Sequence, residues 1–427
     1  MNNSKKIKAG ALQYVLVISV IIAIVIFAFI SLVYLQQRLA IKHDFSKRAI
    51  GNTQLIFEYY QKQEFEYNQQ STIEFLDDEN SKNTFQKKHW GVFDIGIATS
   101  NVKNEYFQKV ALLGAQINNR NALFLKENNS SLLLVGNTKI VGNAALPKQG
   151  VKTGNITGIS YYGNRLIYGQ KKNSTAQLPK IKNSNYLKDF IENYENENEN
   201  STNFELENGM QLHQSFTKEA LIYEDNNPII LENLSLHGHL LIVSKRSITV
   251  KASAKLQDVI LIAPEITIES NTIGTFQAMA SKKIIVESNV QLAYPSALVV
   301  LHKGESIINQ SRNTNQPKEE SCIEIQKNTD IRGVVLYLSE NIQSNFDAQI
   351  KIAENSKVIG EVYCSKNTEL QGSVVGSVVT NNFIIKKSGG TYVNHIYNGE
   401  INALELPKQY AGLQMGQSSN QVAKWVD

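Results

Sequence analysis

Histidine has the widest chemical range of the residue types in this sequence, because imidazole can act as a general base near neutral pH and as a metal ligand. Seven histidines occur, at positions 43, 89, 213, 237, 239, 302 and 395. The pair His237 and His239 would place two imidazoles on one face of a strand, as a metal site requires. Two ligands are too few, and the sequence indicates no third nearby. We therefore predict a surface pair beside the intervening glycine, with no metal and no cofactor.

The acidic residues are the other candidates for chemistry, since lyases and hydrolases built on β-helices cluster acids on one strand face. Asp258 and Glu265 are isolated, whereas Glu269 and Glu287 stand 18 residues apart, with Lys251 one step earlier. Such a column is the ordinary result of stacked strands on a solvated face. The sequence contains no phosphate-binding glycine loop, nucleophile elbow or HExxH motif. We predict no catalytic residue, and a carbohydrate-active enzyme with paired carboxylates is the alternative.

The elements that would carry these residues are strands that recur at fixed steps. The β-branched triplets 248–250, 266–268 and 284–286 begin 18 residues apart, twice in succession. Residues 323–335 realign on 350–362 with a shift of 27 and no gap. Fixed-period similarity of strands is typical of stacked repeats, in which each coil buries its apolar face against the next. The C-terminal half is therefore predicted to be a β-solenoid.

A short motif, Asn-Thr/Ser-x-apolar-x-Gly, occurs at residues 137–142, 328–333, 355–360 and 367–372. Asparagine tolerates a positive φ angle and can bond to nearby backbone, and glycine accepts a bend without a Cβ penalty. The motif is interpreted as the corner of a coil rather than as a ligand loop.

Cys322 and Cys364 are the only cysteines, which excludes a disulfide-stapled scaffold and a four-thiolate zinc site. The 27-residue alignment sets Cys322 opposite Gln349, and Cys364 opposite Tyr337. Vertical stacking of the two thiols is not implied, and a disulfide is left open. The net charge of +4 arises from 43 basic and 39 acidic residues that are interspersed, so we predict no nucleic-acid partner.

The N-terminal region contains an uncharged apolar stretch at residues 14–35. About 20 apolar residues in a helix span the hydrocarbon core of a bilayer, and a signal-peptide core is shorter. We therefore expect an uncleaved single-pass anchor. Basic residues flank the stretch on both sides. We choose the N-terminus inside because the preceding tail is short and a long domain can translocate despite its charge.

The predicted fold class is mainly β, with an N-terminal transmembrane helix, a helical stalk, a small β-rich region and a C-terminal β-solenoid. An acidic, asparagine-rich stretch between the β regions is expected to be a disordered linker. The polar interruption at residues 305–320 is the first candidate for recognition. The predicted boundaries are an N-terminal tail 1–13, transmembrane helix 14–35, stalk 36–72, membrane-proximal β region 73–180, linker 181–205, solenoid 206–400 and C-terminal cap 401–427.

Two segments resemble known families. The segment 333–379, with IRGVVLYL, VIGEVYC and LQGSVVGSVV, resembles bactofilin-type polymer-forming β-helices, which implies a right-handed helix and end-to-end assembly. The segment KKIKAG at 5–10, followed by an apolar helix and a stalk, is similar to a pilin or pseudopilin. Ala11 and Val15 stand where that motif has an aromatic or Met and a Glu, which leaves processing at Gly10 open.

These features predict a non-enzymatic bacterial envelope protein, anchored in the cell membrane with its bulk extracytoplasmic. Its solenoid would act as a structural, scaffolding or adhesive module, through self-association or contacts with envelope proteins or glycans. A minor subunit of a pilus-like or secretion apparatus is a further alternative.

Overall fold

The computed structural model describes residues 10–75, 81–196, 204–303, 321–340, 346–416 and 418–427. The basic tail before residue 10 and the predicted recognition segment 305–320 lie outside these residues. The chain divides into two compact units, one of residues 1–59, 70–85 and 98–108, and one of residues 60–69, 86–97 and 109–427.

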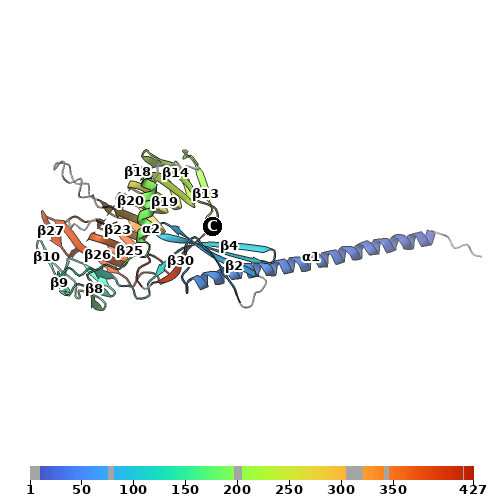
Figure 1. Ribbon diagram of the computed structural model, residues 1–427, viewed down its shortest axis with the longest axis horizontal. Helices are drawn as coiled ribbons and strands as arrows, with labels where there is room; N and C mark the ends of the chain where they lie inside the picture. The colour runs from blue at the N-terminus through green and yellow to red at the C-terminus, as the bar shows by residue number, and fades with distance from the viewer. Residues whose placement is uncertain (1–9, 76–80, 197–203, 304–320, 341–345, 417) are drawn as a thin grey trace, which may run out of the picture. The chain divides into compact units, whose positions relative to one another are not determined.

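The N-terminal helix α1 is continuous over Gly10–Tyr60, 51 residues in all (Figure 1). Its apolar part has a mean hydropathy of 3.3 and none of it is buried, so α1 is long and apolar enough to cross a membrane. The predicted anchor and stalk are one helix that passes through Gly51 without interruption. The helix ends at Tyr60 and not near residue 72, where strand β1 (Gln70–Ile73) has already formed.

The second half of α1 packs within the smaller unit. Thr53, Ile56 and Phe57 are buried, and the Phe57 ring meets the Phe85 ring edge-on at 5.7 Å. The Asn52 amide donates a hydrogen bond to the Ser100 hydroxyl. Positions 49, 53, 56, 57 and 60 recur at the three- and four-residue spacing of one helix face. This half of the helix is therefore amphipathic, whereas the first half is apolar all round.

A five-stranded sheet follows, with the order β1-β2-β3-β4-β30. Its further strands are β2 (Ser81–Trp90), β3 (Phe93–Val102), β4 (Glu105–Gln116) and β30 (Ser419–Val426). Two-residue connections join β2 to β3 and β3 to β4, which only antiparallel pairing allows. Strand β30 pairs antiparallel with β4, from Ser419 opposite Gln116 to Val426 opposite Val110. Residues 117–418 are thus an insertion between two neighbouring strands of this sheet. The prediction that residues 401–427 cap the solenoid is wrong for β30, because this strand belongs to the five-stranded sheet.

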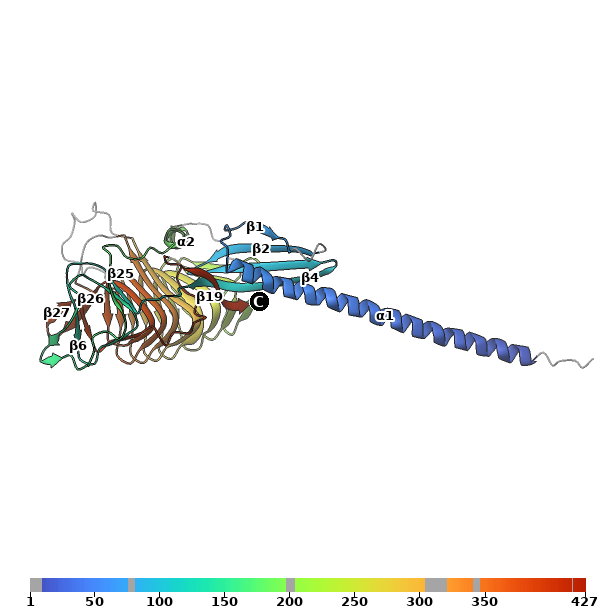
Figure 2. The same ribbon diagram turned by 90° about the horizontal axis from the view of Figure 1, so that it is seen from below.

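Most of the insertion is a parallel sheet that closes on itself, and Figure 2 shows its strands stacked in successive rungs. One antiparallel strand, β27, joins its edge. Its strands are β5 (Leu123–Leu125), β7 (Lys139–Val141), β8 (Ala144–Leu146), β12 (Lys171–Asn173), β13 (Gln211–Gln214), β14 (Leu221–Asp225), β15 (Ile229–Leu231), β16 (Ser235–Gly238), β17 (Leu240–Ser244), β18 (Ser247–Val250), β19 (Lys255–Ile268), β20 (Ile273–Val286), β21 (Gln291–His302), β22 (Cys322–Ile325), β23 (Asp330–Ser339), β24 (Ile350–Ile352), β25 (Lys357–Leu370), β26 (Ser373–Lys387), β27 (Gly390–Val393) and β29 (Glu400–Asn402).

Two small sheets complete the β structure. One is a parallel set of β6 (Leu132–Val135), β9 (Val151–Thr153) and β28 (His395–Tyr397), and the other is a hairpin of β10 (Asn155–Ile156) and β11 (Ile159–Ser160).

The predicted repeat steps are confirmed by the strand register. Ile248 pairs with Ile266, and Ile266 with Ile284, which is the step of 18. Ile323 pairs with Ile350, which is the step of 27. The column of buried isoleucines that results is Ile229, Ile248, Ile266, Ile284, Ile323 and Ile350. Identical side chains recur at these steps because each strand must present the same face to the enclosed core.

Strands β5, β7, β8 and β12 belong to the same parallel sheet, although the sequence predicted residues 73–180 as a separate membrane-proximal region. Strand β5 pairs in parallel with β26, β8 with β5, and β12 with β8. Strand β7 likewise pairs with β29. These strands cover the edge of the last C-terminal rung, which would otherwise expose unpaired backbone groups.

The predicted corner motif is confirmed in part. Asn328 and Asn355 have φ angles of 60° and 62°, and the glycines that end these two copies, Gly333 and Gly360, have φ of 142° and 145°. In the copy at 367–372 neither asparagine nor glycine is left-handed, because Asn367 lies within β25.

The predicted disordered linker contains a second helix, α2, over Ser184–Asn196 (Figure 2). Leu187 and Ile191 are buried in it, one helical turn apart. These side chains pack into the cluster that contains Leu241, Ile260 and other outward-facing residues of the parallel sheet. The prediction of a disordered linker is therefore wrong for residues 184–196. It relied on the asparagine-rich composition and overlooked the apolar residues on one face of the helix, which pack against the parallel sheet.

The isoleucine column makes a matched test of packing possible. Ile266 is 1% exposed and Ile273, in the next strand, is 63% exposed. We expect Ile266→Ala to lower the free energy of unfolding by about 2–5 kcal/mol, since it removes buried carbon and leaves a cavity. Ile273→Ala should change it by less than about 0.5 kcal/mol. Thermal unfolding of the two variants, followed by circular dichroism, measures the difference, and equal effects would contradict the buried column.

Candidate functional site

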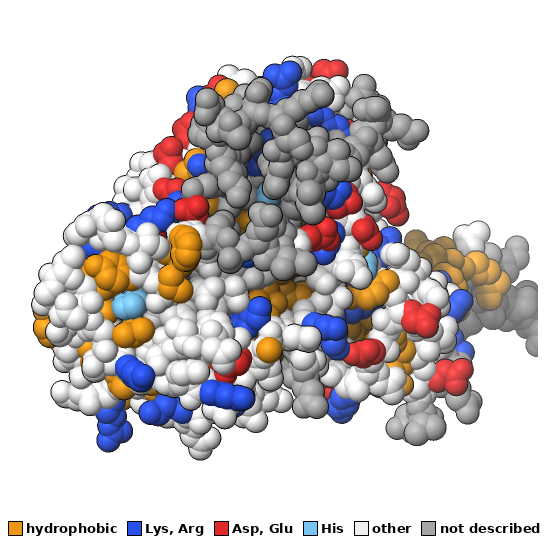
Figure 3. Space-filling view, turned by 60° about the vertical axis from the view of Figure 1, so that its left-hand side comes forward, with side chains coloured by type: hydrophobic (Ala, Val, Ile, Leu, Met, Phe, Trp, Pro, Cys, Tyr) orange, Lys and Arg blue, Asp and Glu red, His pale blue; other side chains and the backbone are white. Residues whose placement is uncertain are grey.

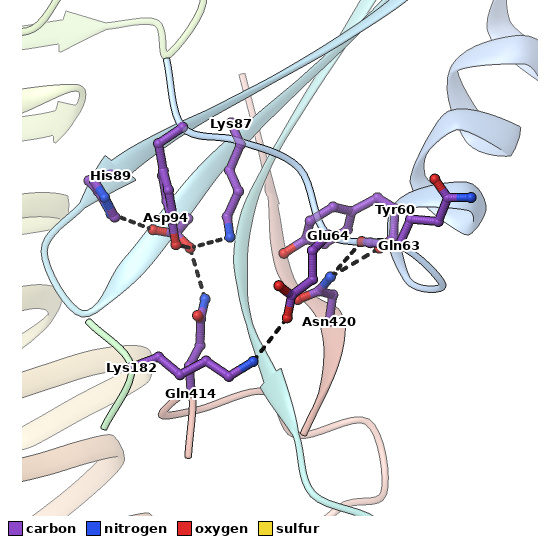
Figure 4. Close-up of polar contacts among 10 residues, drawn as sticks. Tyr60, Gln63, Glu64, Lys87, His89, Asp94, Lys182, Gln414 and Asn420 are labelled. Atoms are coloured by element: carbon purple, nitrogen blue, oxygen red, sulfur yellow. Dashed lines mark hydrogen bonds and ion pairs between the residues drawn. The ribbon is translucent and has the colours of Figure 1, made fainter. Parts of the chain in front are cut away.

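A fully buried carboxylate, that of Asp94 in β3, is the centre of a polar cluster in the larger unit (Figure 4). Its oxygens accept hydrogen bonds from Tyr67 Oη at 3.0 Å and Gln414 Nε2 at 2.9 Å. Lys87 Nζ lies at 3.2 Å and His89 Nδ1 at 3.0 Å. Four side chains from three separate stretches of chain therefore converge on one acid.

The β2–β3 hairpin positions this cluster. Lys87 and His89 are two residues apart in β2, so they share one face of the strand. The connection at Gly91, where φ is 64°, turns the chain back so that Asp94 returns toward them. Gln277 of β20 fixes the connection, because its side chain accepts from Val92 N at 2.8 Å and donates to Trp90 O at 2.9 Å.

Two tyrosine rings enclose the imidazole of His89. The Tyr67 ring and the Tyr186 ring each stack on the imidazole, and their centroids lie 3.6 and 3.7 Å from that of His89. Burial, and next the negative charge of Asp94, raise the pKa of both tyrosine hydroxyls well above their usual value. Both tyrosines therefore stay neutral, and the Tyr67 hydroxyl donates a hydrogen bond to the carboxylate.

The same region ties the chain that leaves α1 to distant segments. Lys182 Nζ contacts Glu64 Oε1 at 3.0 Å, and Asn420 Nδ2 donates to the carbonyls of Tyr60 and Gln63 (Figure 4). Hydrogen bonding to Lys182 lowers the pKa of Glu64. The C-terminal segment therefore holds the segment that follows the helix.

An aspartate that orients a histidine through Nδ1 is half of an acid–base arrangement, because the second ring nitrogen can then exchange protons. No serine, threonine or cysteine in the described part of the chain hydrogen-bonds His89. The cluster thus connects four parts of the chain: strand β2, helix α2, the segment that follows α1, and the C-terminal segment. It contains no nucleophile next to His89 among the described residues. Its chemistry is that of a buried, paired charge.

The predicted histidine pair does not share a face. His237 stacks on His213, whereas His239 packs on Trp90 and Phe216. Gly238 between them has a φ of 95°, which breaks the alternation of the strand. Burial lowers the pKa of both His237 and His239.

The predicted acid column stacks as the 18-residue step requires: Glu269 N donates to Val250 O, and Glu287 N to Ile268 O. Its members have ordinary partners, since Lys251 pairs with Glu232 at 2.8 Å and Glu287 accepts from Ser270. Among the described contacts, none places two of these carboxylates opposite one another, as the acid–base pair of a glycosidase would require.

Cys322 and Cys364 are buried and form no disulfide with one another. Tyr337 is the register partner of Cys364, as the 27-residue alignment predicted. Burial raises the pKa of the Cys364 thiol to about 12, so this side chain is an inert core residue at neutral pH.

Sequence reasoning missed Asp94, although the sequence carried a signal for it. Asp94 is the one charge within the otherwise apolar run of residues 92–98. Aspartate is almost never fully buried unless it is paired, so the pattern implies basic or hydroxyl partners.

The face drawn in Figure 3 shows acidic and basic side chains interspersed, in line with the balanced composition.

No protein-family model and no curated protein sequence matches the chain. Among solved structures it is similar to the crystal structure of the competence-associated pilin ComZ from Thermus thermophilus. The identity is 9%, the TM-score is 0.25, and the alignment covers 89% of this chain and 95% of that chain. A TM-score this low does not establish a shared fold, and the resemblance to bactofilins stays a prediction.

Proposed function

We propose that this chain is a membrane-anchored, pilin-like subunit of a surface or secretion apparatus, which presents its closed parallel sheet as a β-solenoid outside the cytoplasm. The observation that carries the proposal is the division of α1 into two halves. The first half is apolar on every side and wholly exposed, and the second half packs into a small sheet of its own unit.

A helix that is apolar all round needs either lipid or other apolar helices around it. Burying a charge at the centre of a bilayer costs about 2.5–3.5 kcal/mol, and residues 14–35 contain none. The absence of charge supports membrane insertion. The continuation of the same helix into a folded unit supports a subunit whose helix assembles with others while the folded part stays outside the bundle.

The solenoid in this proposal is supported by the parallel register. Successive strands pair at steps of 18 and 27 residues, and the same buried isoleucine position recurs through the stack. Because the whole insertion leaves and rejoins the small sheet at neighbouring strands, it can be presented by that sheet as one module.

A cysteine scan of residues 14–35 in the full chain tests the proposal, because Cys322 and Cys364 are buried and give little background. Membranes of the producing cells would be treated with an oxidant, and cross-linked products resolved by electrophoresis. We expect cross-links, to another copy or to another subunit, at positions that recur every three or four residues, as packed helices require. Ile41→Cys is the matched control, because Ile41 is exposed in the same helix beyond the apolar stretch.

The outcomes separate anchoring from assembly. Recovery of the unmodified chain in the soluble fraction would overturn the membrane anchor. Retention in the membrane without a cross-link at any scanned position would leave a lone anchor and overturn the pilin-like assembly. Ile41→Cys should also react with a membrane-impermeant maleimide from outside an intact inner membrane if the N-terminus is inside.

A further inference from the structure

Three side chains of metal-binding types converge beside β13 of the parallel sheet. His213 of β13 and His237 of β16 are register partners, and their rings stack with centroids 4.6 Å apart. Oδ2 of Asp427 lies 3.9 Å from Nε2 of His213. One ligand atom from each of the three residues lies within 4.8 Å of the other two.

The main chain holds the third member of this group in place. Phe216 N donates a 2.7 Å hydrogen bond to the carbonyl oxygen of Asp427, just beyond β13. Lys424, three residues before Asp427, contacts both carboxylate oxygens of the buried Asp258 at 2.6 and 2.7 Å. Asp427 is therefore fixed beside the histidines by contacts that do not involve its own side chain.

Asp258 adds a further carboxylate near the group, with Oδ2 at 3.8 Å from His237 Nε2. Lys424 engages both of its oxygens, so we count Asp258 as a neighbour of the group and not as a ligand. The ligand set is then two imidazoles and one carboxylate, with room for water because His213 and Asp427 are exposed.

We propose that His213, His237 and Asp427 bind a divalent transition metal, and that Zn²⁺ suits this set. Two histidines, one carboxylate and a water form a common four-coordinate zinc site. Zinc bonds of about 2.0–2.2 Å hold ligand atoms within about 4.3 Å of each other. The three groups must therefore draw together slightly, which the exposed side chains of His213 and Asp427 allow by rotation.

This site also has a structural consequence. The metal would join the end of β30, which belongs to the five-stranded sheet, to β13 and β16 of the parallel sheet. These three segments lie in the same compact unit. Binding would thus fasten the end of β30 to the strands β13 and β16 of the parallel sheet.

The test is a titration of the full chain in detergent with ZnCl₂, after dialysis against a chelator, followed by calorimetry. We expect one equivalent to bind to the unmodified chain. His213→Gln and His237→Gln should each weaken binding by more than about tenfold, because loss of even an outer-shell partner commonly costs 10–100-fold. His395→Gln is the control, since the His395 ring has its hydrogen bond with Val393 O and its aromatic contact with Tyr392.

A second measurement guards against misfolded variants. Zn²⁺ should raise the midpoint of thermal unfolding of the unmodified chain and of His395→Gln, since a ligand stabilises the state that binds it. It should not raise that of the two other variants, whose metal-free midpoints show whether they fold. No stoichiometric binding, or binding that all four proteins share equally, would overturn the site.

Discussion

Gly360→Ala is expected to prevent the parallel sheet from forming, with a loss of more than about 4 kcal/mol in the free energy of unfolding. Gly360 lies in register between Gly333 and Gly376, and its φ of 145° is unfavourable for any residue with a Cβ. A Cβ at Gly360 would collide with the carbonyl oxygen of Gly333. Since that oxygen is main chain in the neighbouring rung, no side-chain rotation can relieve the collision.

A matched glycine separates this collision from simple backbone preference. Gly389 also has a positive φ, of 76°, but a Cβ there would meet nothing within 4 Å. Gly389→Ala should cost only about 1–2 kcal/mol, the ordinary penalty of a left-handed residue. Thermal unfolding and the yield of protease-resistant chain measure both variants. A Gly360→Ala protein that unfolds with the midpoint of Gly389→Ala would refute the close approach of the rungs.

Asp94→Ala is expected to cost about 3–5 kcal/mol, because it leaves a buried ammonium group without its counter-charge. The side chain of Lys87 is 7% exposed and that of Asp94 is 0% exposed, so water cannot replace the lost partner. The variant also removes the acceptor of the Tyr67 and Gln414 hydrogen bonds. Denaturation monitored by tryptophan fluorescence measures the loss, since Trp90 lies four residues from Asp94.

Two controls accompany Asp94→Ala. Asp330→Ala removes an exposed pair with Arg332 and should change stability by no more than about 1 kcal/mol. The double variant Lys87→Met/Asp94→Ala should be more stable than Asp94→Ala alone, since it removes the stranded charge. If the double variant is instead the less stable of the two, the ammonium–carboxylate contact does not determine the effect.

The part of the fold that the sequence could predict is the part in which similar residues must align. Apolar triplets at steps of 18 and 27 residues pair because any other register would move Ile266 or Ile350 out of the core. The anchor could be predicted for a similar reason, since residues 14–35 contain no charged side chain to contradict a helix in lipid.

The rest depended on partners that are distant in sequence. Strands β5, β8 and β12 have three residues each, too few to show a period, and their steps differ from those of the C-terminal half. Strand β30 pairs with a strand some three hundred positions earlier. Asp94 was visible as a lone charge in an apolar strand, but Tyr67 and Gln414 could be assigned to it only from the structure.

The place where the insertion joins the chain also determines how the protein responds to tension. A pull between α1 and the C-terminus loads the contacts between the antiparallel neighbours β4 and β30, through which the insertion both departs and returns. The rungs of the parallel sheet lie on a side branch of that route, joined to it by the contacts of Lys424 with Asp258 and of Asp427 with Phe216. In a subunit built in this way, tension along the helix reaches the parallel sheet first through these few contacts.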